Sequence, residues 1–131
     1  MVKPDGVRRC VVGEVIRRLE AKGLQLKAMK LIRITPELAA RHYEEHRDKP
    51  FYGELISFIT SGSSIPMVWE GREAIQVART LMGATDPIKA QPGTIRGDLA
   101  LAITENIVHG SDSVESAERE IAIYFSAEEI T

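Results

Sequence analysis

Three histidines, His42, His46 and His109, are the side chains of this chain best suited to nucleophilic or metal chemistry near neutral pH. His109 ends a short β-prone run, residues 106–109, and it precedes Gly110 and a polar segment that leads into a predicted helix. A glycine beside a histidine leaves room for approach, and a helix N-terminus favours a bound anion. His109 is therefore the candidate nucleophile.

A nucleophilic imidazole needs one free ring nitrogen and an acceptor that holds the other nitrogen and steadies the charge on the ring. At about 100° per residue, Glu120 projects close to Tyr124, at the edge of the buried stripe of the last predicted helix. Glu120 could therefore point back over the sheet toward His109. The alternative for Glu120 is a surface ion pair with Arg119.

Two other chemistries are disfavoured by the sequence. His42 and His46 lie four residues apart on a predicted helix and could face one metal ion, but no third ligand is evident and their charged neighbours indicate a solvated face. Ser111 and Asp112 beside His109 suggest a hydrolase triad, but no G-x-S-x-G elbow is present and triad members seldom lie so close in sequence.

Phosphate recognition needs fixed positive charge and backbone donors. The long segment 84–98 carries Arg96 among threonine and glycine residues, and Arg79 lies on the helix before it. Together they could form an anion cradle, although Arg79 alone would be a solvated helix residue and Arg96 alone could hold its loop through Asp98. The sequence contains neither a G-x-x-x-x-G-K-[ST] nor a G-x-G-x-x-G motif, which excludes a P-loop or a Rossmann site.

Apolar spacing and capping residues predict the elements that position these groups. We expect a turn at 3–6, helices over 11–22, 39–46, 51–59 and 74–82, strands over 24–34, 64–70 and 106–109, and a Thr35 N-cap followed by Pro36. The last helix is expected to begin with a capping box of Asp112 and Glu115 and to turn inward Val114, Ala117, Ile121, Tyr124 and Phe125. This order predicts an α/β sandwich with helices over one sheet face.

Composition supports a single domain over residues 1–131, since 131 residues with 44% hydrophobic and 27% charged content fit one core. The net charge of −2 argues against a dedicated nucleic-acid binder. With no long apolar run and no signal-like segment, we expect a cytoplasmic protein without a membrane partner. Cys10, the single cysteine, is expected to be a small packing residue.

The sequence closely resembles the nucleoside diphosphate kinase family. The matching words run in family order over nearly the whole chain, and the last of them is highly specific. They are Lys3-Pro4-Asp5-Gly6-Val7, Thr60-Ser61-Gly62, Met67-Val68-Trp69-Glu70-Gly71, Gly83-Ala84-Thr85, Pro92-Gly93-Thr94-Ile95-Arg96-Gly97-Asp98 and Asn106-Ile107-Val108-His109-Gly110-Ser111-Asp112-Ser113-Val114-Glu115-Ser116-Ala117.

The resemblance implies a two-step transfer of the terminal phosphoryl group of ATP, or of another nucleoside triphosphate, to a nucleoside diphosphate. His109 stands in the place of the phosphorylated histidine. Glu120 matches the carboxylate that holds its other nitrogen, with Ser111 in support. Lys3 and Tyr43 match groups that contact the transferred phosphoryl group and offset its charge.

The resemblance also implies a nucleotide site that tolerates any base and either sugar, since every base can stack on an aromatic ring. Its members in this sequence are Asn106 at the sugar and phosphate, Arg79, Thr85 and Arg96 at the β-phosphate, and Phe51 at the base with Leu55 and Ile103 beside it.

The family fold implied is an α+β, ferredoxin-like βαββαβ sandwich with a four-stranded antiparallel sheet. Mg²⁺ is expected as cofactor, held mainly by nucleotide phosphates and water, with Asp112 as a possible ligand through water. A homo-oligomer is expected, with a hexamer favoured over a tetramer. Pro87 lies in the loop that lines trimer contacts in hexameric members.

One departure from the family pattern concerns the first strand, because only Met1 and Val2 precede Lys3. A typical strand has about five or six residues, so we expect a truncated first strand, a weaker central ladder and a less firmly placed Lys3. Either the sequence starts late or the protein tolerates a short strand. The alternative function is a nucleotide-binding regulatory module with little or no catalysis.

Overall fold

The computed structural model describes all 131 residues. Its α-helices are α1 (Pro4–Arg8), α2 (Val12–Lys22), α3 (Pro36–His42), α4 (Tyr52–Ile59), α5 (Ala74–Met82), α6 (Ile95–Leu99) and α7 (Val114–Tyr124). The strands are β1 (Gln25–Met29), β2 (Ile32–Arg33), β3 (Ser63–Ser64) and β4 (Met67–Glu70), and two 3-10 turns are η1 (Glu44–His46) and η2 (Ala127–Glu129).

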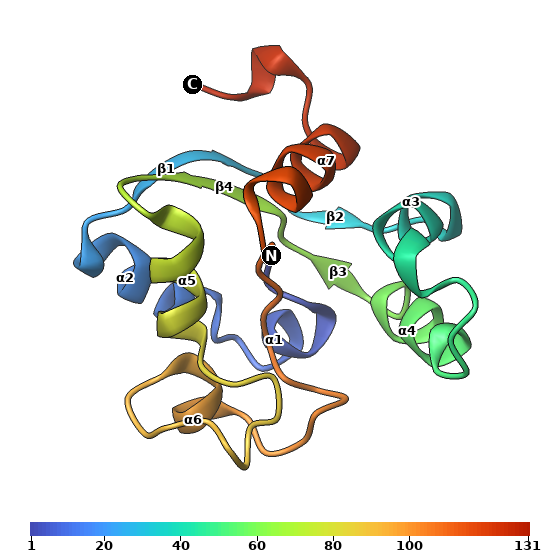
Figure 1. Ribbon diagram of the computed structural model, residues 1–131, viewed down its shortest axis with the longest axis horizontal. Helices are drawn as coiled ribbons and strands as arrows, with labels where there is room; N and C mark the ends of the chain where they lie inside the picture. Colours follow the sequence, from blue (N-terminus) through green and yellow to red (C-terminus); the bar gives the residue numbers. More distant parts are fainter.

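The sheet is a long interrupted hairpin to which two short segments are added. β1 pairs antiparallel with β4 and β2 with β3. Val2 lies beside this hairpin, forming an antiparallel bridge to Ile65 on one side and to Val108 on the other. The spatial order is therefore residue 108, residue 2, β3–β4, β1–β2. Figure 1 shows β1 beside β4 and β2 beside β3. This order confirms the ferredoxin-like α+β fold. The first strand is reduced to Val2, which forms two bridges, and the last strand is reduced to Val108, which forms one.

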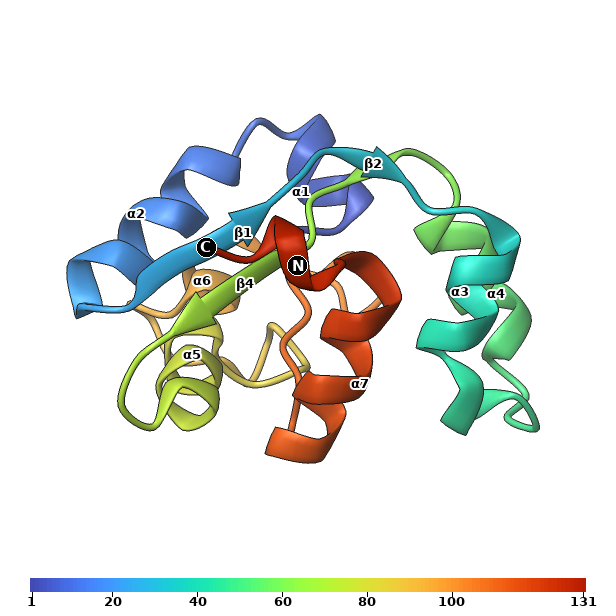
Figure 2. The same cartoon turned by 90° about the horizontal axis from the view of Figure 1, so that it is seen from above.

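Helices cover both faces of this sheet, and not one face as expected, because alternate residues of β4 point to opposite sides. Met67 and Trp69 pack on a core built around α2, α5 and α6. Val68 packs on a second core with residues of α3, α4 and α7. Figure 2 shows α3 and α4 as a pair set apart from α2 and α5, with α7 between them.

The first helix corrects the turn expected at residues 3–6. Pro4 occupies the first helical turn, where its missing N–H costs nothing, and α1 then runs to Arg8. Gly6 is required there because a Cβ would lie 2.7 Å from Cγ1 of Val2 and 3.1 Å from Cγ2 of Ile107. The short helix therefore packs its backbone directly against the centre of the sheet.

Cys10 is not the packing residue expected from the sequence. It is exposed, and its φ of 60° ends α1 in a left-handed turn. The predicted helix over 39–46 is also divided, since α3 begins at Pro36 after the expected Thr35 cap and ends at His42. The turn η1 follows and leads to α4.

The cap of α7 also differs from the expectation. Ser113, and not Asp112, is the N-cap, because its side chain accepts a hydrogen bond from the amide of Ser116 at 3.1 Å. Shifting the start by one residue leaves Val114 exposed at the first helical position, so its predicted inward orientation is wrong. Tyr124 and Phe125 are buried as expected.

The segment before His109 contains the main backbone strain of the molecule. Ile107 is fully buried with a φ of 73°, and the amide of Val108 donates to the carbonyl of Asn106 at 2.8 Å, which makes a γ-turn. The amide of Ile107 donates to Oδ2 of the buried Asp5 at 2.9 Å, and its carbonyl accepts from the amide of Lys3 at 2.8 Å. These bonds hold a β-branched residue in a conformation that costs about 1–3 kcal/mol.

No helix of the structure has the length and apolar character needed to span a bilayer.

The α7 cap gives a direct stability prediction. Ser113→Ala should lower the free energy of unfolding by about 1 kcal/mol, because the amide of Ser116 loses its acceptor. Asp112→Ala should lower it by less than about 0.5 kcal/mol, because an exposed carboxylate just before the helix contributes only through the helix dipole. Urea denaturation of both variants measures the difference, and equal losses would contradict the assignment of the cap.

Candidate active site

His109 lies where the sheet ends and the chain turns toward α7. Its backbone exchanges two hydrogen bonds with Met1, at 2.8 and 2.9 Å, which fixes the residue beside the centre of the sheet. Gly110 follows it and packs against Met82 of α5, so a Cβ at that position would require the end of the Met82 side chain to move. The imidazole is thus presented from a rigid backbone.

The ring of His109 is held by Glu120 from α7, as the helical spacing predicted. Nε2 of His109 lies 2.6 Å from Oε1 of Glu120, and the hydroxyl of Ser111 donates to the same oxygen at 2.9 Å. The two side chains retain exposed fractions of 30% for His109 and 12% for Glu120. Arg119 also lies 3.6 Å from Oε2 of Glu120. Glu120 therefore makes both the contact with His109 and the alternative ion pair with Arg119.

The pKa values of both His109 and Glu120 are lowered, which favours a neutral ring and an ionised carboxylate. Burial lowers the pKa of His109 below its usual value, even though Glu120 raises it, so the imidazole favours the neutral form. Burial acts to raise the pKa of Glu120, but hydrogen bonds from His109 and Ser111 outweigh it and the pKa falls to about 2. The result is a neutral ring backed by a carboxylate.

His42 is a site residue that sequence reasoning missed, since it was weighed only as a metal ligand with His46. It is buried, and its ring meets that of His109 edge to face at a centroid distance of 4.6 Å. Its Nδ1 lies 3.0 Å from the hydroxyl of Tyr124. The apolar spacing of Ala39 and His42 along α3 was the signal that pointed to burial.

Tyr43 follows His42 and lies at the edge of the same group. The two rings are 4.7 Å apart. Burial raises the pKa of Tyr43 to about 12, so its hydroxyl keeps the proton and can donate.

Lys3 and Asn106 form a second group, joined to the first through the backbone of residues 106–109. Nζ of Lys3 donates to Oδ1 of Asn106, and Nδ2 of Asn106 donates to the carbonyl of Thr85 at 2.9 Å. Burial lowers the pKa of Lys3 to about 8, and Asp5 opposes that shift. The ammonium thus remains charged at pH 7 in a partly dry environment.

Arg96 is buried under this segment and does not point freely into solvent. Its guanidinium donates to the backbone carbonyls of Asn106 at 3.2 Å, Gly83 at 2.9 Å and Val108 at 2.7 Å. The alternative in which Arg96 holds its loop through Asp98 is wrong in its partner, because Asp98 pairs instead with Arg18 at 2.8 Å. Arg96 therefore ties the 84–98 segment to the strand that carries the histidine.

Arg79, Thr85 and Asp112 line one open hollow of about 760 Å³ between α5 and the loop that follows it. Arg79 also donates to the carbonyl of Gly110 at 3.0 Å, beside His109. Hydroxyl and cationic groups line the same hollow, including Thr80, Lys89 and Thr94. The structure thus brings together three of the candidate phosphate and metal contacts.

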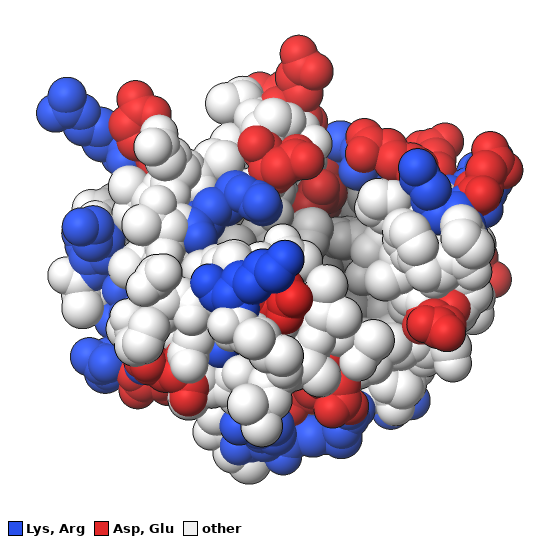
Figure 3. All heavy atoms as spheres, turned by 60° about the horizontal axis from the view of Figure 1, so that its bottom comes forward, with Lys and Arg blue, Asp and Glu red and all other residues white.

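The candidate base contacts lie outside this hydrogen-bonded network. Phe51 is exposed just before α4, with its ring 5.6 Å from that of His46, and Leu55 is half-buried on α4. Ile103 is exposed in the loop after α6. Figure 3 shows a hollow beside the lobe that α3 and α4 form, with Lys and Arg atoms near its opposite side.

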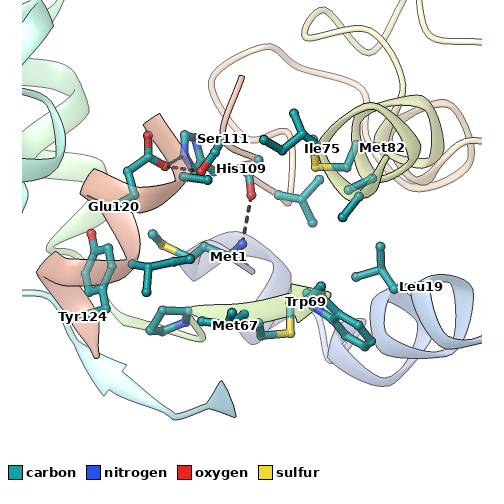
Figure 4. A pocket seen from close by; sticks show the side chains of 18 of the residues that line it. Met1, Leu19, Met67, Trp69, Ile75, Met82, His109, Ser111, Glu120 and Tyr124 are labelled. Atoms are coloured by element: carbon teal, nitrogen blue, oxygen red, sulfur yellow. Dashed lines mark hydrogen bonds and ion pairs between the residues drawn. The ribbon is translucent and has the colours of Figure 1, made fainter. Parts of the chain in front are cut away.

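A partly open cavity of about 150 Å³ lies behind His109. Figure 4 shows Glu120, Ser111 and His109 at one end of it, and Leu19 and Trp69 at the other. Most of the lining is apolar, from α2, β4 and α5. The apolar lining explains why burial dominates the protonation of His109.

A partly exposed histidine whose second nitrogen is held by a carboxylate is an arrangement suited to catalysis by an imidazole. A family model described as "Nucleoside diphosphate kinase" matches residues 1–130. The chain belongs to the nucleoside diphosphate kinase family, and the resemblance drawn from its sequence motifs is confirmed.

Similar proteins support the same assignment over almost the whole chain. A nucleoside diphosphate kinase of Bacillus cereus is 57% identical over 130 residues, which cover 99% of this chain and 88% of that protein. One of Archaeoglobus fulgidus is 59% identical, with 99% and 86% covered. The solved structure of a halophilic nucleoside diphosphate kinase from Halobacterium salinarum in complex with CDP has a TM-score of 0.96 at 52% identity, with 99% and 87% covered.

The buried His42 makes the free energy of unfolding depend on pH in a predictable direction. Burial lowers the pKa of His42 from 6.5 to about 3, so between these values the unfolded chain binds a proton that the folded chain does not. The free energy of unfolding should therefore fall as pH drops from 6.5 toward 3, by up to about 1.4 kcal/mol per pH unit for this group.

Denaturation of the wild type and of His42→Gln between pH 7 and 4.5 measures this contribution. The variant should show a shallower loss of stability on acidification, because it lacks the group that protonates on unfolding. Parallel pH profiles for the two proteins would contradict the assignment.

Proposed function

We propose that this chain transfers the terminal phosphoryl group of a nucleoside triphosphate to a nucleoside diphosphate through a phosphohistidine at Nδ1 of His109. The observation that carries this proposal is the 2.6 Å contact of Nε2 with Glu120. Because the carboxylate accepts a hydrogen bond from Nε2–H, the proton of the neutral ring stays on Nε2 and the free lone pair lies on Nδ1.

In the first half-reaction, Nδ1 attacks the γ-phosphorus of the triphosphate. The N–P bond forms while the bond from that phosphorus to the β–γ bridging oxygen breaks, and the nucleoside diphosphate leaves with those electrons. The ring then carries positive charge, which Glu120 offsets across the Nε2–H bond. In the second half-reaction a terminal oxygen of another diphosphate attacks the phosphorus and the N–P bond breaks.

Lys3 and Tyr43 are proposed to stabilise the phosphoryl group during transfer. A lysine whose pKa is about 8 is still charged at neutral pH, and its amine is oriented by Asn106. The phenol of Tyr43 retains its proton and supplies a donor. Donors fixed before the reaction offset the charge on the equatorial oxygens without reorganising water.

Arg79, Thr85 and Asn106 are proposed to bind the β-phosphate and the sugar, because the first two line the 760 Å³ hollow and Asn106 contacts the backbone of Thr85. The guanidinium of Arg96 has five N–H donors, and three of them bond backbone carbonyls. The remaining N–H groups are proposed to bind phosphate. Burial lowers the pKa of Arg96 to about 10, so it stays charged.

Phe51, Leu55 and Ile103 are proposed to hold the base by stacking and apolar contact. Phe51 and Ile103 are large apolar side chains left exposed at the surface. A stacking surface without hydrogen bonds to base edges accepts any base, which supports broad base and sugar specificity.

Mg²⁺ is proposed as the cofactor, bound to the β- and γ-phosphates with Asp112 as a contact through water. The donors present fit that arrangement, because Asp112 is a carboxylate on the lining of the hollow and no cluster of carboxylates competes for the ion. Mg²⁺ keeps several waters and needs few protein oxygens. When bound, it neutralises phosphate charge and favours departure of the diphosphate.

A homo-oligomer in the cytoplasm is proposed, with a hexamer favoured over a tetramer. Three large apolar side chains support assembly because they are highly exposed in the single chain: Leu31 at 64%, Ile88 at 81% and Leu101 at 86%. Ile88 follows Pro87, the residue expected at trimer contacts.

The assembly is tested by sedimentation. The wild type should sediment at about six times the chain mass of 14.5 kDa. Ile88→Asp should shift the protein toward smaller species, because a carboxylate buried in the interface would have no partner. A wild type that sediments as a single chain at micromolar concentration would contradict the proposal.

The covalent step is tested by incubating the protein with γ-labelled ATP and Mg²⁺ and measuring acid-labile, base-stable label. The wild type should be labelled and His109→Ala should not. Glu120→Gln should be labelled about 10–100-fold more slowly, because the residue that orients the ring is lost. ADP binding without label would favour the regulatory module, and label on His109→Ala would refute the proposed nucleophile.

A further inference from the structure

Three metal-ligating side chains converge at the back of the site described above. One donor atom from each of His42, His109 and Glu120 lies within 4.8 Å of the other two. They come from α3, from the end of the last strand segment and from α7, so no local sequence spacing reveals the group. Two imidazoles and one carboxylate, with a fourth position left open, form a donor set that Zn²⁺ prefers.

The contacts within the cluster leave its donor atoms within reach of one ion. The shortest of these contacts joins Nε2 of His109 to Oε1 of Glu120 at 2.6 Å. An ion bound by both groups would replace this hydrogen bond and release its proton.

Neighbouring side chains orient two of the three ligands, His42 and Glu120. The hydroxyl oxygen of Tyr124 lies 3.0 Å from Nδ1 of His42, where it can accept the Nδ1 proton and leave Nε2 free for a metal. Ser111 donates to Oε1 of Glu120. Such outer contacts fix ligand geometry and are typical of zinc sites.

One neighbouring cation opposes the binding of a metal ion to this group, and the ion has one route of access. Arg119 is the cation in contact with it, 3.6 Å from Oε2, which leaves Oε1 to face the histidines. All three ligands line the 150 Å³ cavity, and His109 is the most exposed of them. An ion would enter past His109.

We propose that His42, His109 and Glu120 form an inhibitory site for Zn²⁺ or a similar borderline cation, whose occupancy excludes phosphorylation of His109. The binding claim stands on the side-chain cluster; the inhibition claim rests on the proposed function.

The exclusion follows from the two ring nitrogens of His109. If the ion binds Nε2, the ring proton moves to Nδ1 and the attacking lone pair is lost. If the ion binds Nδ1, it occupies that lone pair directly. Either arrangement removes the nucleophile, and conversely a phosphoryl group on Nδ1 blocks or repositions the ring.

The site should discriminate between Zn²⁺ and the Mg²⁺ that accompanies the nucleotide. Mg²⁺ prefers six oxygen ligands in octahedral geometry, which two imidazoles do not supply. The same protein would then be activated by one divalent ion and inhibited by the other.

Binding is measured without any nucleotide, by titrating the purified protein with Co²⁺ and following its visible absorption, then displacing Co²⁺ with Zn²⁺. The expected result is one site per chain, with intense tetrahedral absorption. His42→Gln should weaken binding by at least about tenfold, since loss of an outer contact alone costs 10–100-fold. His46→Gln, which removes the histidine outside the cluster, should bind as the wild type does.

Tyr124→Phe provides a second, milder variant in case His42→Gln unfolds, which circular dichroism at each titration point would reveal. It removes only the hydroxyl on Nδ1 of His42 and should weaken Co²⁺ binding by roughly tenfold. Wild-type affinity in both variants, or more than one equivalent site, would overturn the proposal.

Exclusion is measured by preloading the protein with one equivalent of Zn²⁺, removing free metal and adding labelled Mg·ATP. Labelling should fall at least about tenfold and return when a chelator is added, and prephosphorylated protein should not bind Co²⁺. Full labelling of the zinc-loaded protein would overturn the inhibitory claim. Absence of label in the metal-free protein would instead refute the proposed function, while the Co²⁺ titration would still decide the metal site.

Discussion

The hydrogen bond between Nε2 of His109 and Oε1 of Glu120 is the interaction on which the rest of the site depends. It meets two demands that conflict in water, because a good nucleophile must be neutral while its product ring is positive. Burial favours the neutral imidazole of His109 before the reaction. The carboxylate of Glu120, 2.6 Å from Nε2, then offsets the positive charge that develops on the ring. Removing either contribution leaves a ring that is protonated too early or a product without a counter-charge.

The backbone that presents this ring is held by strain that several elements share. A buried isoleucine at a φ of 73° persists only because its amide is bonded to Asp5 and its carbonyl to the amide of Lys3, while Arg96 donates to the residues on either side. Each of these bonds ends on a buried group, where an unmade bond costs about 1–3 kcal/mol. The Lys-Pro-Asp-Gly motif therefore has two tasks, since Lys3 faces the proposed phosphoryl position and Asp5 supports the turn beneath it.

The contrast between local and long-range features explains what the sequence could predict. Helix limits near Pro36, Gly23 and Gly83 were predictable, because proline and glycine act on their own backbone. The contact between Glu120 and His109 was within reach of helical spacing alone. The cap of α7 was placed one residue early because an aspartate and a serine adjoin, and only the geometry of the chain decides which one bonds the amide of Ser116.

His42 shows the limit of such reasoning most clearly. Its spacing to His46 drew attention to the wrong partner, and the sequence offered no third ligand, because the real neighbours are 67 and 78 positions away in the numbering. For Arg96 the sequence left open a phosphate contact and a loop contact through Asp98. It did not reveal the backbone carbonyls that Arg96 contacts, because no pattern of residue types displays them. The proposed zinc site uses the same side chains, because two imidazoles and a carboxylate that converge are a donor set that zinc prefers. Selectivity between Mg²⁺ and Zn²⁺ then depends on the oxygen ligands that each ion brings. Mg²⁺ bound to a polyphosphate already has its preferred oxygen ligands and does not need the two histidines. Zn²⁺ that arrives without such ligands binds the two imidazoles and the carboxylate more favourably.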